Sequence, residues 1–205
     1  PKPSGIWQPY WRAACFRLHT QTAARSLSDL FWEKLMTSLQ TLQVEVNGQA
    51  QVRSVAPRQH LVDFIRNELG LKGSHLGCEH GVCGACTVEV NGRIVRGCLT
   101  LAVQAQGGKV RTIEGLSADG DVRDLQDAFV RNNALQCGFC TPGMVMAAKE
   151  LLEAKPDATR EEVREWMSGN YCRCTGYQAI IDAICETLAE RAKNSSSRPS
   201  EKVSV

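Results

Sequence analysis

The sequence predicts an α+β fold in which a small sheet-containing domain precedes an all-helical domain. Between about residues 38 and 115, apolar side chains alternate along short segments bounded by glycine-containing turns, which is the pattern of β-strands. Beyond Gly115, apolar residues recur with the 3.6-residue period of amphipathic helices. The chain has ten cysteines, and eight of them form two sets of four, one set in each region.

The first domain, expected over 38–117, follows the element order of a β-grasp ferredoxin. Two hairpins are expected where alternating runs flank an Asn-Gly pair, because a type I′ turn needs positive φ at both central residues. The pairs are Asn47-Gly48 and Asn91-Gly92. Residues 60–70 carry apolar side chains at helical spacing, and residues 109–113 form a closing strand. The order is hairpin, helix, cysteine loop, hairpin and strand.

The second domain, expected over 118–192, is a four-helix bundle. Its segments are 121–135, 141–155, a short helix after Thr159, and 175–193. Thr141 is the expected N-cap of the second helix, with Pro142 at the first helical position, and Thr159 with Glu162 forms a capping box. The side chains expected to face inward on the first and last helices are Val122, Leu125, Phe129, Val130, Ile180, Ile181, Ile184 and Leu188.

The two ends of the chain differ from the rest. Residues 1–37 mix Trp, Pro and Arg without periodicity, and we expect an upstream extension or a disordered leader there, with a transit peptide as the alternative. Cys15 is expected to be a bystander in that segment. The polar stretch 193–205 is expected to be a disordered tail. The formal net charge of +2 gives no sign of a nucleic-acid surface.

The first cysteine set has the spacing of a plant-type [2Fe–2S] ferredoxin. Its spacing is C-x4-C-x2-C, with the fourth cysteine after eleven further residues. Five glycines between Gly70 and Gly84 would let the backbone N–H groups approach sulfur and adopt positive φ. The expected ligands of this first cluster are Cys78, Cys83, Cys86 and Cys98.

The second set reads C-x2-C, then 31 residues, then C-x-C. Each pair directly precedes an expected helix, so two positive helix ends would face one anionic site. Four thiolates are the number that a [2Fe–2S] cluster requires, two for each iron. The expected ligands of this second cluster are Cys137, Cys140, Cys172 and Cys174.

Other uses of the cysteines fit less well. Disulfide frameworks belong to short secreted chains, and we find neither a secretory signal nor a membrane span in the sequence. A structural zinc site is the stronger rival, although C-x-C falls outside the usual zinc spacing. His75 and His80 are expected to be loop residues rather than Rieske ligands, because four cysteines are already available. Cys185 is expected to pack in the core of the last helix.

We find no dinucleotide fingerprint, phosphate-binding loop or nucleophile motif in the sequence, so no catalytic residue is assigned. Two one-electron centres without substrate chemistry indicate an electron relay. A free-standing two-cluster ferredoxin is the alternative to a subunit of a larger enzyme, and a zinc module that mediates protein contacts is a third reading.

Three segments resemble the small iron–sulfur subunit of the molybdenum hydroxylases, the family of xanthine dehydrogenase, carbon monoxide dehydrogenase and isoquinoline oxidoreductase. They are GCEHGVCGACTVEVNG, QCGFCTPGM and GNYCRCTGYQ. The resemblance covers about 38–190 and includes all eight cysteines in order.

The resemblance implies a large partner subunit with a molybdopterin cofactor and possible transfer to FAD on a medium subunit or to an external acceptor. It implies that Gln136 and Cys174 lie against the pterin, and that protein and partner shield the second cluster. Electrons would pass from the pterin through the Cys174 cluster and the Cys78 cluster. We expect a heteromer in the cytoplasm. The substrate is chosen on the large subunit, so aldehydes, N-heterocycles, purines and carbon monoxide all remain open.

Overall fold

The computed structural model describes residues 38–196, and the leader expected at 1–37, with Cys15, lies outside this range. The first domain holds a five-stranded mixed sheet in the order β2-β1-β5-β3-β4. Its strands are β1 (Gln40–Val46), β2 (Gln49–Val55), β3 (Thr87–Val90), β4 (Arg93–Arg96) and β5 (Lys109–Arg111). Only β1 and β5 are parallel. The sheet and the helical second domain confirm the predicted α+β class.

The described chain also contains helices in both domains. In the first domain they are α2 (Leu61–Asp63), the π-helix η1 (Phe64–Glu68) and the 3₁₀-helix η2 (Ala102–Ala105). They are followed by α3 (Ile113–Asp119), α4 (Arg123–Arg131), α5 (Thr141–Ala154), α6 (Arg160–Met167) and α7 (Gln178–Ser196). Among the described residues, none of the helices combines the length and apolarity needed to cross a bilayer.

The two predicted hairpins are confirmed. The φ angles are 50° at Asn47 and 76° at Gly48, and 51° at Asn91 and 79° at Gly92, as type I′ turns require. The inward face of β1 buries Leu42, Val44 and Val46 against the helical segment 61–68. The alternation of apolar and polar residues therefore sets the register of the sheet.

Several local predictions need correction. The expected helix at 60–70 is one short α-helical turn that continues as a π-helix. The closing strand, expected over 109–113, ends at Arg111, and α3, a helix that was not predicted, follows it. Asn47 explains the difference, because its side chain accepts a hydrogen bond from the Thr112 amide at 2.9 Å. An added Cβ on Gly115 would lie 2.3 Å from the Asn47 side chain, so glycine lets α3 pack against the first turn.

The helical domain has its core between α4, α5, α6 and α7. The prediction for Val130 is wrong, because its side chain is 67% exposed while its neighbour Phe129 points inward. The N-cap of α5 is Cys140 rather than Thr141, whose hydroxyl is buried without a partner. The capping box is confirmed: Thr159 and Glu162 exchange side-chain and backbone hydrogen bonds. All four apolar residues predicted inward on α7 are buried.

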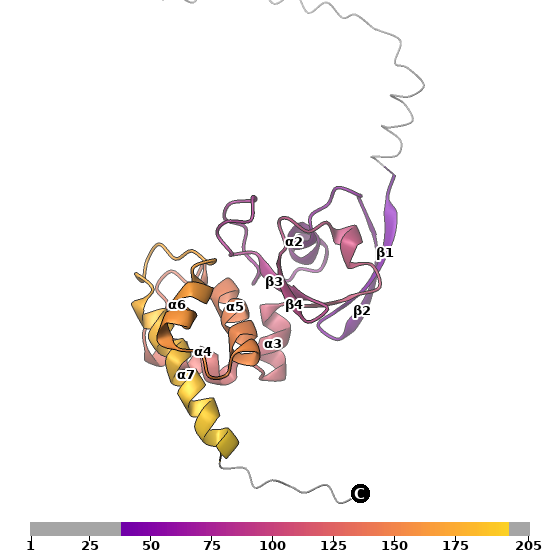
Figure 1. Cartoon of the computed structure of the whole chain (residues 1–205). Helices are drawn as coiled ribbons and strands as arrows, with labels where there is room; N and C mark the ends of the chain where they lie inside the picture. Colours follow the sequence, from indigo (N-terminus) through magenta and orange to yellow (C-terminus); the bar gives the residue numbers. More distant parts are fainter. Residues whose placement is uncertain (1–37, 197–205) are drawn as a thin grey trace, which may run out of the picture.

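The two domains lie side by side, with α3 and α5 next to the sheet domain (Figure 1). Lys149 of α5 pairs with Glu89 of β3 at 3.1 Å, and the exposed fractions of the two side chains are only 8% and 12%. Glu150 accepts a hydrogen bond from the backbone N–H of Ile94. Removing one partner of such a buried pair would leave an uncompensated charge, so the pair stabilises the docking of the two domains.

Candidate metal centres

The first thiol site is built by one loop and one hairpin of the sheet domain. The loop between η1 and β3 carries three cysteines, and Cys98 follows directly after β4. Cys86 and Cys98 are each only 2% exposed, whereas Cys78 and Cys83 are half-buried. The side chains interact in two pairs, Cys78 with Cys83 and Cys86 with Cys98.

Electrostatics differ sharply within this site. The backbone N–H of Cys83 donates to Cys78 Sγ at 3.4 Å, and this bond lowers the pKa of the Cys78 thiol to about 6. Burial raises the pKa of Cys86 to about 11. A buried thiolate at Cys86 therefore needs a cationic centre beside it, which a bound metal supplies.

The expected role of glycine is met at specific positions. Gly81 and Gly84 have φ angles of +83° and +74°, which residues other than glycine rarely adopt. A Cβ on Gly77 would lie 3.0 Å from Cys83 Sγ. These glycines let the loop curl around the sulfur atoms.

The second thiol site joins two loops that are far apart in the sequence. Cys137 and Cys140 precede α5, while Cys172 and Cys174 precede α7. Cys137 Sγ lies 3.5 Å from Cys174 Sγ, and Cys140 interacts with the Cys172 side chain. Unlike the buried pair of the first site, Cys137 and Cys174 are exposed. Gln136 braces the two loops, because its side-chain amide donates to the Cys174 carbonyl at 3.1 Å.

Two supporting residues of the second site were missed from the sequence. The Thr175 hydroxyl donates to Cys172 Sγ at 3.1 Å, and the Cys172 N–H donates to the Tyr177 hydroxyl at 2.9 Å. Burial alone would raise the pKa of Cys172, but the hydrogen bonds from Thr175 and nearby groups lower it. Burial raises the pKa of Cys140 to about 12. The sequence did carry a signal for Thr175, because a hydroxyl-bearing residue directly after the C-x-C can donate a hydrogen bond to a cysteine sulfur.

The two predicted loop histidines bond to backbone carbonyls. His75 Nδ1 lies 2.7 Å from the carbonyl oxygen of Phe139, and the two rings stack with centroids 4.6 Å apart. His80 Nδ1 lies 2.5 Å from the Cys78 carbonyl oxygen. His75 thus connects the first cysteine loop to the loop that carries Cys137 and Cys140.

Cys185 lies at the edge of the helical core rather than fully inside it. Its side chain is partly buried against that core, and burial raises its thiol pKa. None of the nine cysteines within 38–196 forms a disulfide.

The thiols of each site interact in two pairs. The side-chain interactions join Cys78 with Cys83 and Cys86 with Cys98 in the first site, and Cys137 with Cys174 and Cys140 with Cys172 in the second. This arrangement suits a [2Fe–2S] cluster, which takes two thiolates on each of its irons.

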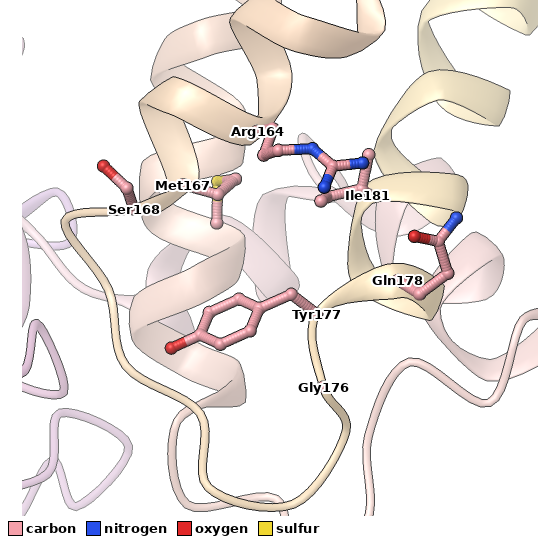
Figure 2. Close-up of a pocket in the computed structure, with 7 residues that line it drawn as sticks. All are labelled: Arg164, Met167, Ser168, Gly176, Tyr177, Gln178 and Ile181. Carbon is pink, nitrogen blue, oxygen red and sulfur yellow. The ribbon is translucent and has the colours of Figure 1, made fainter.

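A pocket of about 350 Å³ lies beside the second site, between α6 and the start of α7. Figure 2 shows Arg164 extending from α6 toward Ile181 and Gln178 of α7, with Tyr177 below Met167. The lining contains one cation and one serine but no histidine, thiol or carboxylate. Within this lining, Ser168 therefore has no histidine or carboxylate beside it to activate its hydroxyl.

A β-grasp domain and a helical domain, each with a four-thiol site, define a ferredoxin-type electron carrier. Residues 44–112 match the family described as "2Fe-2S iron-sulfur cluster binding domain", and residues 112–185 match "[2Fe-2S] binding domain". The chain belongs to the small iron–sulfur subunits of the molybdenum hydroxylase family.

Similar proteins include the nicotine 6-hydroxylase small subunit of Paenarthrobacter nicotinovorans, which is 56% identical over 71% of this chain and 87% of its own length. Caffeine dehydrogenase subunit gamma of a Pseudomonas species is 52% identical, and the match covers 72% of this chain and 90% of that subunit. The solved structure of quinoline 2-oxidoreductase from Pseudomonas putida 86 matches with a TM-score of 0.72 and 50% identity, covering 77% of this chain and 98% of the matched chain.

Proposed function

We propose that this chain relays electrons through two [2Fe–2S] clusters inside a molybdenum hydroxylase complex. Electrons would enter the helical-domain cluster from a molybdopterin cofactor on a large subunit. They would leave from the sheet-domain cluster to FAD on a medium subunit or to an external acceptor. When bound, each cluster supplies a one-electron carrier, and this chain supplies the thiolates, the hydrogen bonds that tune them and the distance between them.

The observation that carries the proposal is the meeting of two paired-thiol sites at one backbone contact. The Tyr171 N–H donates to the Cys83 carbonyl at 2.8 Å. Tyr171 immediately precedes Cys172 of the second site, while Cys83 belongs to the first. Two proposed carriers are thereby joined across the domain boundary.

Surface composition supports a partner subunit rather than a free-standing ferredoxin. The large apolar side chains exposed near the cysteine loops include Val82, Leu99, Leu135, Phe139 and Tyr171. Exposed apolar side chains beside the cysteine loops suit burial against a partner. With Cys137 and Cys174 exposed in this chain, the expected shielding of the second cluster has to come from the partner. The relatives named as small, beta or gamma subunits support the same reading.

We place the complex in the cytoplasm. Our reason is that thiols held as metal ligands rather than as disulfides suit a reducing compartment. The substrate remains a property of the large subunit.

Affinity purification through this chain under anaerobic conditions tests the proposal. We expect a large chain carrying molybdenum to co-purify in a fixed ratio, with iron in both domains. An iron-loaded chain recovered alone, without molybdenum, would instead support the free-standing ferredoxin.

Gln136→Ala tests the direction of electron flow. If Gln136 lies beside the electron donor, substrate should reduce the second cluster more slowly while the spectra of both clusters stay intact. Rapid-reaction absorption and freeze-quench EPR measure this rate, and an unchanged rate would place the donor elsewhere.

A further inference from the structure

The loops of the two thiol sites are held together by a buried amide. Asn170, only 2% exposed, stands two residues before Cys172. Its side-chain nitrogen donates to the carbonyl of Gly84 at 3.2 Å, and Gly84 directly follows Cys83. Its side-chain oxygen accepts from Arg96 at 3.2 Å. We call Gly84, Arg96 and Asn170 the clasp.

Arg96 extends the clasp into both domains. It ends β4, two residues before Cys98. Its guanidinium donates to the Gly169 carbonyl at 2.6 Å and to the Thr87 hydroxyl on β3. Lysine has a single point charge and could not reproduce this planar set of donors.

The contact leaves no room for larger residues. A Cβ on Gly84 would lie 2.6 Å from the Asn170 side chain, and the φ of Gly84 is +74°. A Cβ on Gly143 of α5 would lie 2.3 Å from the Gly84 carbonyl oxygen. Both distances are below any real Cβ contact, so the two backbones meet directly. Such close packing defines the separation of the loops tightly.

The clasp lies next to the Tyr171–Cys83 hydrogen bond, because Asn170 and Gly84 are the sequence neighbours of Tyr171 and Cys83. From the Cys83 carbonyl this bond leads to the Tyr171 amide, and the next residue is Cys172. The route between one thiol of each site therefore contains covalent bonds and one hydrogen bond. The Tyr171 ring is 54% exposed, so the backbone rather than the aromatic side chain makes the connection.

We propose that Asn170 and Arg96 are positioning residues for electron transfer between the two sites, and that they act by holding the Tyr171–Cys83 hydrogen bond in place. This inference rests on the proposed function. With clusters held by the two cysteine sets, one electron would pass between them, so that the second cluster would be oxidised by one electron as the first is reduced by one. No bond forms or breaks, and no proton moves.

The chain offers a matched control at the same domain boundary. The Lys149–Glu89 pair also joins the two domains, but neither residue belongs to a cysteine loop. Lys149→Met should weaken domain docking without altering the loop contact. A purely structural clasp would make Asn170→Ala and Lys149→Met behave alike.

The test uses the purified complex with both clusters present. After photoreduction, freeze-quench EPR follows the redistribution of the electron between the clusters. Redox titration gives their potentials, and the spin–spin splitting of the doubly reduced protein reports their separation. We expect Asn170→Ala to slow redistribution several-fold at unchanged potentials and with altered splitting. We expect Lys149→Met to lower the thermal midpoint and leave the redistribution rate unchanged.

Asn170→Asp keeps the test decisive if Asn170→Ala fails to assemble. It retains the shape and the acceptor for Arg96, but a carboxylate cannot donate to the Gly84 carbonyl, so redistribution should again slow. Wild-type rates in either variant would overturn the inference, and so would slowing in His75→Ala but not in the clasp variants. A wild-type protein that shows one cluster or no redistribution would instead defeat the proposed function.

Discussion

The two thiol sites of this chain differ in construction and in exposure. The first is formed within the sheet domain by one glycine-containing loop and one hairpin, with Cys86 and Cys98 buried. The second is assembled from two loops separated by a helix pair, with Cys137 and Cys174 exposed. A site made within one domain can be complete in the isolated chain, whereas the exposed site depends on what covers it. This contrast supports our proposal that the partner which delivers electrons covers the second site.

Serine substitutions should separate the sites most strongly. Cys174→Ser should abolish or perturb the second-cluster EPR signal and retain the first, because the thiols that interact with Cys174 are those of Cys137 and Cys172, both in the second set. Cys86→Ser should do the reverse and also lower the stability of the sheet domain, because it alters a buried side chain. Iron content and low-temperature EPR measure both. Loss of both signals from Cys174→Ser would contradict two independent sites.

Thiol reactivity should differ widely within the first site. In iron-free protein at pH 7, the pKa of about 6 leaves Cys78 mostly as thiolate, whereas the pKa of about 11 keeps Cys86 protonated. We expect iodoacetamide to modify Cys78 faster by roughly two orders of magnitude, after allowing for the lower nucleophilicity of a more acidic thiol.

Peptide mass spectrometry over time measures this difference. Because ionisation of Cys78 is complete above its lowered pKa, its rate should level off above about pH 7 and fall as the pH drops below about 6. Equal rates at the two cysteines would mean that the hydrogen bond from Cys83 does not form.

Crowding the domain boundary should lower the unfolding free energy of the protein. Gly143→Ala places a Cβ against the Gly84 carbonyl, and overpacking of this kind typically costs about 1–3 kcal/mol. Gly169→Ala is the control, because its nearest neighbour at 3.3 Å is the flexible end of Arg96. Chemical denaturation compares their unfolding free energies, and equal stability of the two variants would contradict the close approach of α5.

A single hydroxyl should tune only the second site. Thr175→Val removes the hydrogen bond to Cys172 Sγ, so the more anionic reduced state loses stabilisation and the potential falls. A loss of about 1 kcal/mol corresponds to roughly 40 mV for one electron. Thr141→Val is the matched control, since the Thr141 hydroxyl has no partner. Redox titration should show no change in the first cluster, and a shift there would contradict the assignment.

The sequence predicted what local chemistry determines. Asn-Gly pairs specified both hairpins, and helical spacing specified the buried face of α7. It failed where tertiary contacts decide. Asn47 organises the start of α3 from 65 residues away, so Gly115 could not be interpreted locally. Val130 lies on the side of α4 that the rest of the fold leaves exposed to solvent.

The candidate sites divide in the same way. Cysteine spacing grouped the eight proposed ligands, but it could not reveal which thiols pair, because pairing depends on loops that meet only in the folded chain. The clasp at Asn170 likewise arises from three-dimensional proximity, because Gly84 is 86 residues away. The contacts from Thr175 and Tyr177 are local, three and five residues from Cys172, and a hydroxyl-bearing residue after the C-x-C was their signal in the sequence. The exposure of the loop residues also could not be predicted from the sequence, because it depends on how the two domains dock.

The most direct test is low-temperature EPR of the dithionite-reduced protein, purified anaerobically with its native partners, with iron, zinc and molybdenum quantified on the same sample. Two distinct [2Fe–2S] signals, about four irons per chain and molybdenum in the preparation are the predicted result. A single signal, or zinc at the thiols with no signal, would contradict the two-cluster relay.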